Sequence, residues 1–207
     1  MDVTLLLMSE NQYAKPLGLL GEILEKDPSS YVHWLIVCGG AALQTYGIIH
    51  RATKDVDIFA QRTEVDHSID SAYPLSENLK QAVRKVASVL NLPENWLNAS
   101  TSFLSLSLES YPEYFWQDHK DESYGSKLRV SYLSPRGLIT LKTLAVLQRD
   151  QPRDTEDLIA LAPTESNITE ALDWCLIHTL EHQAIAHKIT NLLNQLNHGN
   201  LINRYQA

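Results

Sequence analysis

The segment 37–59, "VCGGAALQTYGIIHRATKDVDIF", constrains the fold more than any other part of this chain. Its apolar start predicts a buried strand, which ends in a glycine pair and is followed by a short helix over 41–47. Its end is a second apolar run, 54–60, in which Asp55 and Asp57 alternate with apolar residues. The pattern predicts a strand that buries one face in the core of an α/β domain and carries two acids on its other face.

The two aspartates favour a divalent cation. Residues two apart on a strand share a face, with Cα atoms about 7 Å apart, so Asp55 and Asp57 are expected to project side by side. Two ionised carboxylates brought to about 4 Å repel each other by up to about 4 kcal/mol at a surface-like dielectric. Mg²⁺ prefers carboxylate oxygens and leaves room for substrate phosphates, and two such ions can clamp the attacking and leaving oxygens of a phosphoryl-type transfer. We therefore predict Asp55 and Asp57 as metal ligands, with a two-ion site as one option.

The glycine pair favours a phosphate beside this strand. Gly39 and Gly40 carry no side chains, so their backbone can come close to a ligand, and the start of the following helix offers N–H groups to a phosphate. The alternative is an ordinary tight turn beside a solvent-facing pair of acids on an edge strand. Each motif is weak alone, so the prediction depends on their combination.

The combined spacing resembles the signature of the nucleotidyltransferase fold of the polymerase-beta-like superfamily. The closer resemblance is to the AbiEii-like toxin nucleotidyltransferases and related bacterial families of unknown function, whose motif reads roughly G-G-x-A, then arginine, serine or threonine, and D-x-D. The matching residues here are Gly39, Gly40, Ala42, Arg51, Thr53, Asp55 and Asp57. Those families continue with an apolar K-x-x-A helix and an R-D-x-x-D-[LI] segment, matched here by Lys142, Ala145, Arg153, Asp154, Asp157 and Leu158. The segment "LPENWLN", 92–98, also looks like one that recurs in the relatives of unknown function.

This resemblance implies the nucleotidyltransferase fold, a small mixed sheet flanked by helices, with a C-terminal helical region. It implies a magnesium-dependent enzyme that moves a nucleoside monophosphate from a nucleoside triphosphate (NTP) to a hydroxyl acceptor, which could be an RNA end such as that of a tRNA, a protein side chain or a small molecule. A cognate antitoxin is a further partner that it suggests. The site residues that it implies are the catalytic Asp55, Asp57, Lys142 and Asp154 and the nucleotide-binding Gly39, Gly40, Arg51, Thr53 and Asp157.

The resemblance also assigns roles, each with an alternative. Thr53 would contact the triphosphate or orient the metal ligands. Lys142 would pair with phosphate as a point charge, and Asp154 or Asp157 would position that lysine or the acceptor. Lys142 could instead be an exposed helix lysine, and Asp154 a helix N-terminal acid stabilised by the dipole. Arg51 could instead be a structural partner for an aspartate.

One departure from the family pattern bears on catalysis. Active members of the superfamily usually supply a third carboxylate from a later strand, as general base and metal ligand. The matching strand is expected at "LRVSYL", 128–133, which has no acid. Glu109, at the end of the alternating segment 103–110, is a weak substitute. A catalytically degenerate protein that binds a nucleotide or a partner is therefore the second hypothesis.

The pattern along the chain is α/β in front and all-helical behind. We expect a nucleotidyltransferase-like domain over 1–163 and a helical appendage over 164–207 that packs on the same domain. Apolar periodicity predicts helices over 11–27, 76–93, 135–150 and 153–163 and from 169 onward, and strands over 33–40, 54–60, 103–110 and 127–134. The aromatic and acidic segment 110–126 is expected to be a surface loop.

Charge and composition narrow the function classes. A formal net charge of -8 argues against a protein coated in nucleic-acid-binding surface. The stretch 127–153 is locally basic, with Asp150 as its single acid, and suits an anionic small molecule or a phosphate-rich contact, or is a set of solvated helix charges. No apolar run is long enough for a bilayer and no export signal is evident, so a cytoplasmic protein without membrane contact is expected. Cys38 and Cys175 are expected to be buried thiols rather than a disulfide pair.

A second motif competes with this interpretation. The sequence "HTLEH", 178–182, matches H-x-x-E-H, which on a helix would place His178 and His182 one turn apart as zinc ligands. A third ligand should follow, and His187 and His198 are only nominal candidates. A histidine pair without metal is the favoured interpretation.

Overall fold

The computed structural model describes residues 12–100, 107–149, 151–178 and 182–206. Contacts group the chain into two compact units: a sheet unit of Met1–Glu109 and Gln117–Ser134, and a helical unit of Ser110–Trp116 and Pro135–Ala207. Within the described ranges no helix is both long and apolar enough to cross a membrane.

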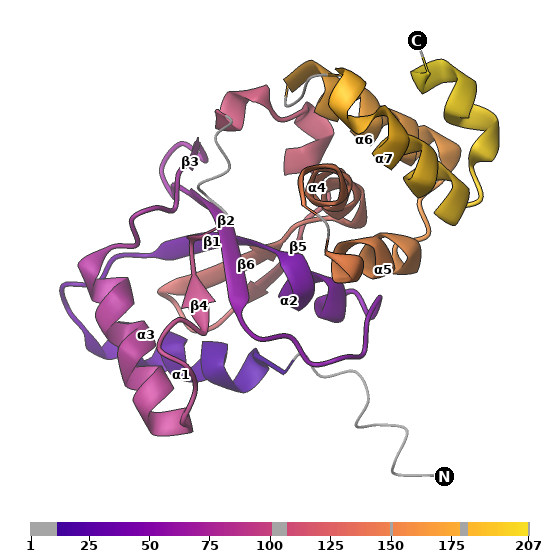
Figure 1. Cartoon of the computed structure of the whole chain (residues 1–207). Helices are drawn as coiled ribbons and strands as arrows, with labels where there is room; N and C mark the ends of the chain where they lie inside the picture. Colours follow the sequence, from indigo (N-terminus) through magenta and orange to yellow (C-terminus); the bar gives the residue numbers. More distant parts are fainter. Residues whose placement is uncertain (1–11, 101–106, 150, 179–181, 207) are drawn as a thin grey trace, which may run out of the picture. The chain divides into compact units, whose positions relative to one another are not determined.

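The sheet unit contains a six-stranded mixed sheet in the order β3-β2-β1-β6-β5, with β4 paired to β2 off this path (Figure 1). The strands are β1 (His33–Cys38), β2 (Val56–Arg62), β3 (Ile69–Asp70), β4 (Leu97–Asn98), β5 (Lys120–Ser123) and β6 (Leu128–Tyr132). Strand β1 runs antiparallel to β2 and parallel to β6, and β4 runs parallel to β2. This arrangement confirms the predicted fold class, a small mixed sheet flanked by helices.

Three helices accompany the sheet: α1 (Ala14–Lys26), α2 (Gly39–Thr45) and α3 (Glu77–Leu90). Helices α1 and α3 lie side by side, and α2 follows β1 directly (Figure 1). Ser76 caps the N-terminus of helix α3, because its hydroxyl accepts a hydrogen bond from the backbone N–H of Leu79. It ends at Asn91, whose φ of 53° is left-handed.

The core of the sheet unit follows the apolar periodicity. Every residue of β1 is buried, while β2 is buried at its apolar positions and half-buried at Asp57. The facing helices contribute Leu17 and Leu20 from α1 and Val86 from α3, none of which is exposed to solvent. The strands predicted over 33–40 and 54–60 are therefore confirmed. Both cysteines are buried and form no disulfide, as expected.

Two expectations about the segment 103–126 are wrong. Lys120–Ser123 is not loop but β5, an edge strand that pairs antiparallel with β6. Its residues are polar and mostly exposed, so no apolar alternation marks it as a strand. The alternating strand predicted over 103–110 lies partly outside the described residues, and its end, Leu108–Ser110, is the 3₁₀ helix η3.

The helical unit is made of η4 (Glu113–Trp116), α4 (Pro135–Gln148), α5 (Pro152–Ala160), α6 (Glu165–His178), α7 (His182–Gln195) and η5 (Gly199–Tyr205). The helices predicted over 135–150 and 153–163 are confirmed as α4 and α5. The helical stretch expected from 169 onward is divided among α6, α7 and η5. By contacts, α4 and α5 group with these C-terminal helices in one compact unit.

The segment Ser110–Trp116 belongs to the helical unit because its side chains pack there. Trp174 of α6 donates from its indole N–H to the backbone oxygen of Ser110 at 2.8 Å, and its ring centroid lies 4.8 Å from that of Tyr111. Phe115 is fully buried beside Tyr111, with ring centroids 4.6 Å apart. Aromatic residues that suggest a surface loop in the sequence therefore form part of a core.

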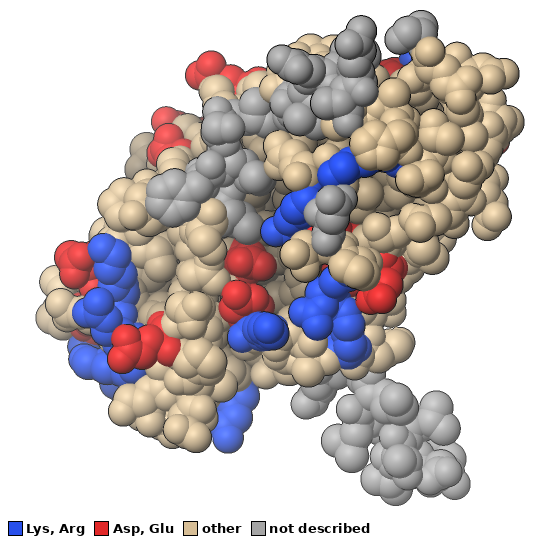
Figure 2. Space-filling view, viewed as in Figure 1, with Lys and Arg blue, Asp and Glu red and all other residues tan. Residues whose placement is uncertain are grey.

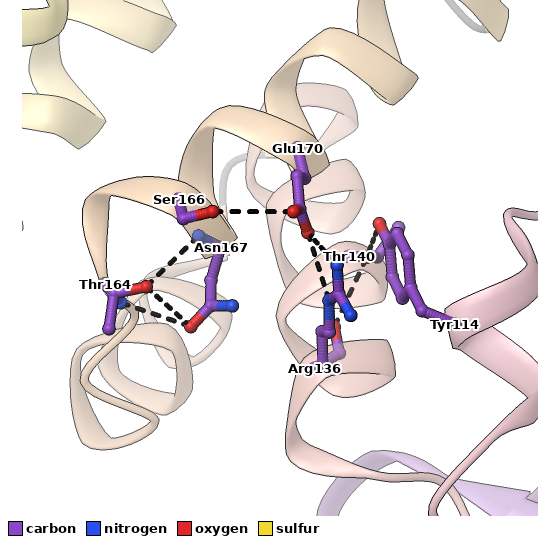
Figure 3. A network of polar contacts seen from close by, with 7 residues as sticks. All are labelled: Tyr114, Arg136, Thr140, Thr164, Ser166, Asn167 and Glu170. Atoms are coloured by element: carbon purple, nitrogen blue, oxygen red, sulfur yellow. Dashed lines mark hydrogen bonds and ion pairs between the residues drawn. The ribbon is translucent and has the colours of Figure 1, made fainter.

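A polar network reinforces this packing (Figure 3). The hydroxyl of Tyr114 lies 3.0 Å from that of Thr140 on α4. Arg136 lies over the Tyr114 ring, 4.1 Å from its centroid, and donates to Glu170 of α6 from two nitrogens at 3.0 and 2.7 Å. The network joins η4, α4 and α6 through one arginine.

Candidate nucleotide and metal site

The pairing of β1 with β2 places the glycine turn against the aspartates. The register pairs Cys38, the last residue of β1, with Asp57 near the start of β2. Because the two strands are antiparallel, the turn that leaves β1 lies beside the point where Asp55 and Asp57 enter the sheet. Residues 15–18 positions apart in sequence thus meet in one place, as their spacing predicts.

The turn needs glycine at both positions. Gly39 has a φ of +66°, and a Cβ built there would lie 2.7 Å from Oδ2 of Asp57. A Cβ on Gly40 would overlap the methyl group of Thr53. The backbone therefore approaches the Asp57 carboxylate and Thr53 more closely than any other residue type allows.

The loop that carries Thr53 is held by two residues that the sequence did not reveal as site residues. Gln12 donates from its side-chain amide to the backbone oxygen of Thr53 at 2.7 Å, and its side-chain oxygen accepts from the Thr53 backbone N–H at 3.1 Å. Tyr13 is buried, and its hydroxyl donates a hydrogen bond to the same backbone oxygen of Thr53 at 3.1 Å. Burial raises the pKa of Tyr13, and the charges of Asp55 and Asp57 add to that increase, so the phenol stays protonated and remains a donor.

Gln44 of α2 completes this support. Its side-chain amide donates to the backbone oxygen of Arg51 at 2.7 Å and to the side-chain oxygen of Gln12 at 3.2 Å. Arg51 itself is half-buried in the loop before Thr53. Gln12 lies 41 residues before Thr53 and 32 residues before Gln44 in the sequence. No local motif could therefore reveal the contacts that Gln12 makes with them.

Strand β4 adds a third polar side chain beside the aspartates. Its register pairs Asn98 with Asp57, and the side-chain amide of Asn98 lies 3.4 Å from Oδ2 of Asp55. The strand that the resemblance matches to the third carboxylate, β6, pairs with β1. Strand β4 brings a polar side chain to the aspartates instead, and that side chain is an amide rather than a carboxylate.

No third acid joins the pair in the part of the chain that the structure describes. Among those residues no group of three or more His, Cys, Asp or Glu is placed to hold a metal ion. Glu109, the weak substitute, is exposed in η3. The two aspartates are thus the acidic side chains that the described part of this region offers.

The residues present fit Mg²⁺. The donor set consists of hard carboxylate oxygens, which this ion prefers, and the missing side chain at Gly39 leaves room beside Oδ2 of Asp57. The Thr53 hydroxyl oxygen is buried and has no hydrogen-bond partner among the described residues. A buried hydroxyl without a partner is costly, which favours a ligand oxygen next to it.

Three other predicted site residues meet in the helical unit. Nζ of Lys142 on α4 lies 2.9 Å from Oδ1 of Asp154 and 2.7 Å from Oδ2 of Asp157, both on α5. The Lys142 side chain is only 12% exposed, so the alternative of an exposed helix lysine is wrong. The predicted role of the aspartates in positioning this lysine agrees with these contacts.

Asp154 is a buried acid in the first turn of α5 that is paired twice. Arg149 donates to its two carboxylate oxygens at 2.7 and 3.1 Å, in addition to Lys142. Burial opposes ionisation of Asp154, but the hydrogen bonds and charges of Arg149 and Lys142 outweigh it and hold its pKa below the ordinary 3.8. The cluster of Lys142, Arg149, Asp154 and Asp157 therefore brings two basic and two acidic side chains into contact.

The locally basic stretch 127–153 is largely neutralised by acids. Arg129 pairs with Asp121, Arg136 with Glu170, and both Lys142 and Arg149 with Asp154. On the face drawn in Figure 2, basic and acidic side chains are also interspersed over α1 and α3. Because of its ion pairs, the stretch 127–153 offers less positive charge to a nucleic acid than its sequence suggests.

The H-x-x-E-H segment does not form one continuous described helix. Helix α6 ends at His178 and α7 begins at His182, and residues 179–181 lie outside the described residues. The nominal third ligand His198 lies 2.8 Å from the backbone oxygen of Pro163 through Nε2, a contact that gives it a structural role.

Comparison with known proteins agrees with the fold and the motif. A family model described as "nucleotidyltransferase of unknown function (DUF6036)" matches residues 18–207. No curated protein and no solved structure matches the chain. The matched region includes the glycine turn, both aspartates and the lysine cluster. The chain therefore belongs to this family of nucleotidyltransferases of unknown function.

Proposed function

We propose that the protein is a magnesium-dependent nucleotidyltransferase that moves a nucleoside monophosphate from an NTP to a hydroxyl acceptor. The observation that carries this proposal is the close approach of the glycine turn to the Asp57 carboxylate, two residues from Asp55 on the same strand. A turn that can approach phosphate oxygens and two carboxylates that can hold a cation lie within one site. Membership of a nucleotidyltransferase family supports the reaction class.

The reaction requires positioning and charge neutralisation more than covalent chemistry by the protein. The acceptor oxygen attacks the α-phosphorus of the NTP, and the bond from that phosphorus to the oxygen bridging to the β-phosphate breaks, so pyrophosphate leaves. Asp55 and Asp57 would hold Mg²⁺, which when bound neutralises charge on the reacting phosphates. Gly39 and Gly40 would place backbone N–H groups against phosphate oxygens, and the Thr53 hydroxyl would donate to one of them.

Lys142 would supply a positive charge to a phosphate group, as a lysine ammonium can. Asp154 and Asp157 limit the movement of its ammonium group, so it would act from a fixed position. The acceptor would be an RNA end, a protein hydroxyl or a small molecule. The pairing of most bases in 127–153 weakens the case for a large RNA contact.

Nucleotide binding tests the proposal directly. Calorimetry with each NTP, with and without Mg²⁺, should show binding that depends on Mg²⁺. Asp55→Asn and Asp57→Asn should each weaken it about tenfold or more, because each removes a charged ligand oxygen. Asp70→Asn is a matched control, since Asp70 is an exposed acid on β3 that also pairs with β2.

The control separates the site from general electrostatics. Asp70→Asn makes the same charge change on the same sheet and should leave Mg²⁺-dependent binding unchanged. If no NTP binds, or if all three variants bind as the wild type does, the magnesium site at Asp55 and Asp57 is refuted. If the two site variants do lose Mg²⁺-dependent binding, the next measurement is transfer itself, followed by the release of pyrophosphate when a pool of acceptors is added.

A non-catalytic nucleotide- or partner-binding protein is the second candidate. The observation that favours it is the amide of Asn98 beside Asp55, where a third carboxylate would supply a base. Mg²⁺-dependent NTP binding without release of pyrophosphate from the NTP in the presence of any acceptor would support this candidate over the enzyme.

The resemblance to AbiEii-like toxin nucleotidyltransferases suggests a biological role for the protein as the toxin of a toxin–antitoxin pair. As a toxin in the cytoplasm, the protein would arrest growth by transferring nucleotide to an essential RNA or protein and would be neutralised by a cognate antitoxin. Induced expression of the wild type should then slow growth, and Asp55→Asn/Asp57→Asn should not. Equal growth of both strains would refute the toxin role.

A further inference from the structure

We propose that Asn98 is a positioning residue of the aspartate site, which orients the Asp55 carboxylate through its side-chain amide. The metal part of this inference depends on the proposed function, because Asp55 is the ligand through which Asn98 would act. The hydrogen bond itself does not depend on it.

The register of β4 places Asn98 beside both aspartates. In the parallel β2–β4 pair, Asn98 lies opposite Asp57. Paired residues of neighbouring strands project to the same face, and Asp55 lies two residues before Asp57, so the three side chains share one face. The backbone N–H of Val56 donates to the Trp96 oxygen at 2.6 Å, which fixes the register between the two aspartates.

The Asn98 side chain has one orientation that satisfies its neighbours. Its oxygen accepts from the backbone N–H of Ser100 at 3.0 Å and from the Ser100 hydroxyl. Its nitrogen lies 3.4 Å from Oδ2 of Asp55 and 3.4 Å from the backbone oxygen of Asn95. A flipped amide would turn an oxygen toward two acceptors and a nitrogen toward the N–H donor of Ser100. The contacts therefore assign the N–H group to the side that faces Asp55.

This arrangement limits the rotation of the Asp55 carboxylate without adding charge. A distance of 3.4 Å is at the long end of the hydrogen-bonding range, so the contact is weaker than a short hydrogen bond, but it still favours one orientation of the carboxylate. Groups that orient a metal ligand in this way typically change metal affinity 10–100-fold when removed. The site would thus hold a divalent ion with two negative charges, and Asn98 would set the angle at which Asp55 presents its oxygens.

The inference is tested first without metal, by a double-mutant cycle of Asn98→Ala and Asp55→Ala in urea unfolding, because alanine at either position removes the hydrogen bond. If the amide donates to the carboxylate, the two substitutions share one interaction, and the midpoint shift of the double variant should differ from the sum of the single shifts. Additive shifts would show that Asn98 does not act on Asp55 and would overturn the inference.

The second test is Mn²⁺ binding, followed by electron paramagnetic resonance on the full chain. Asn98→Ala should weaken Mn²⁺ binding about tenfold, and Asn95→Ala, the matched control, should not, because Asn95 is exposed and meets Asn98 only through its backbone oxygen. Wild-type affinity in Asn98→Ala would overturn the positioning role and leave the proposed function intact. If the wild type binds no Mn²⁺, the proposed metal site fails, and the role of Asn98 in metal binding fails with it.

Discussion

His33 at the start of β1 is a buried histidine whose charge state should couple stability to pH. Its side chain is 3% exposed, and its Nε2 has the Ser30 hydroxyl at 3.4 Å. Burial lowers the pKa of His33 from the ordinary 6.5 to about 4. The folded protein therefore keeps the ring neutral over a pH range in which the unfolded chain binds a proton.

Stability should fall as the pH is lowered from about 6.5 toward 4, because the unfolded state binds more protons there. For a folded pKa of about 4, the contribution of His33 at pH 5 is about 2 kcal/mol below that at pH 7.5. Urea unfolding at both pH values, on the wild type and on His33→Leu, measures this contribution. The variant should show a smaller loss between the two values, and equal losses would refute a neutral buried ring.

At the residue scale, the sequence predicted the glycines and aspartates of the site but not the polar residues that hold them in place. The spacing of Gly39, Gly40, Asp55 and Asp57 is local, so a motif can show it. The supports come from Gln12, Gln44 and Asn98, which reach the site through strand pairing and loop packing across 32 to 43 residues. Such contacts depend on the folded sheet and have no signature in a single sequence.

Helix α1 contains a matched pair of glycines that tests its packing. A Cβ on Gly18 would meet nothing within 4 Å, whereas one on Gly21 would overlap the backbone oxygen of Tyr124. Gly18→Ala should stabilise the protein by about 0.5–1 kcal/mol, because alanine is the better helix former. Gly21→Ala should destabilise it by about 1–3 kcal/mol, because the helix must move to make room.

Denaturant unfolding of the two variants measures this difference. The substitutions are chemically identical and lie three residues apart on one helix, so any difference reports the environment. Stabilisation by both would show that α1 does not pack closely against the Tyr124 backbone.

Helices α4 and α5 are joined by the cluster around Lys142. Lys142→Met should cost about 3–5 kcal/mol at pH 7, because it removes the cation that contacts two buried carboxylates, and Arg149 then compensates Asp154 but not Asp157 in the same way. Asp154 has a lowered pKa in the wild type, so its contribution is present above about pH 3.8 and is lost as the pH falls through the folded value. Without the lysine Asp154 protonates more readily, because Lys142 is one of the groups that lower its pKa, so the destabilisation should shrink between pH 7 and pH 4.

An exposed pair in the same unit provides the control. Arg204 of η5 pairs with Asp173 of α6, and both side chains are more than a third exposed. Arg204→Met should cost about 1 kcal/mol or less, as exposed ion pairs contribute little. If Lys142→Met cost no more than this variant, the cluster would have no stabilising role beyond that of a surface pair.

Most elements were predictable because their apolar periodicity is strong. The amphipathic α3 and the buried β1 are examples, since burial imposes the pattern that the sequence shows. Strand β5 was missed because its residues are polar and exposed at the edge of the sheet, where pairing to β6 and not burial defines the strand. The expected loop over 110–116 was wrong for a related reason, because its aromatic residues are buried by helices encoded later in the chain.

At the scale of the whole molecule, the chain passes between its two units three times, around residues 110, 117 and 135. A fragment of residues 1–134 would therefore contain Ser110–Trp116 without the helices on which it packs. We expect chymotrypsin to cut this fragment after Phe115 much faster than the full chain, because the Phe115 ring is buried in the intact protein. Mass spectrometry of timed digests would measure the two rates, and equal rates would contradict the assigned packing.

The same threading has a consequence for biosynthesis. Ser110 leaves the ribosome 64 residues before Trp174, whose indole N–H donates to the backbone oxygen of Ser110 in the folded protein. At about 5–20 residues per second, the aromatic segment would wait roughly 3 to 13 s, exposed on the nascent chain, before its partner is made. An apolar stretch displayed for that long is a natural target for a chaperone, so co-translational assistance should matter more for this protein than its modest length suggests.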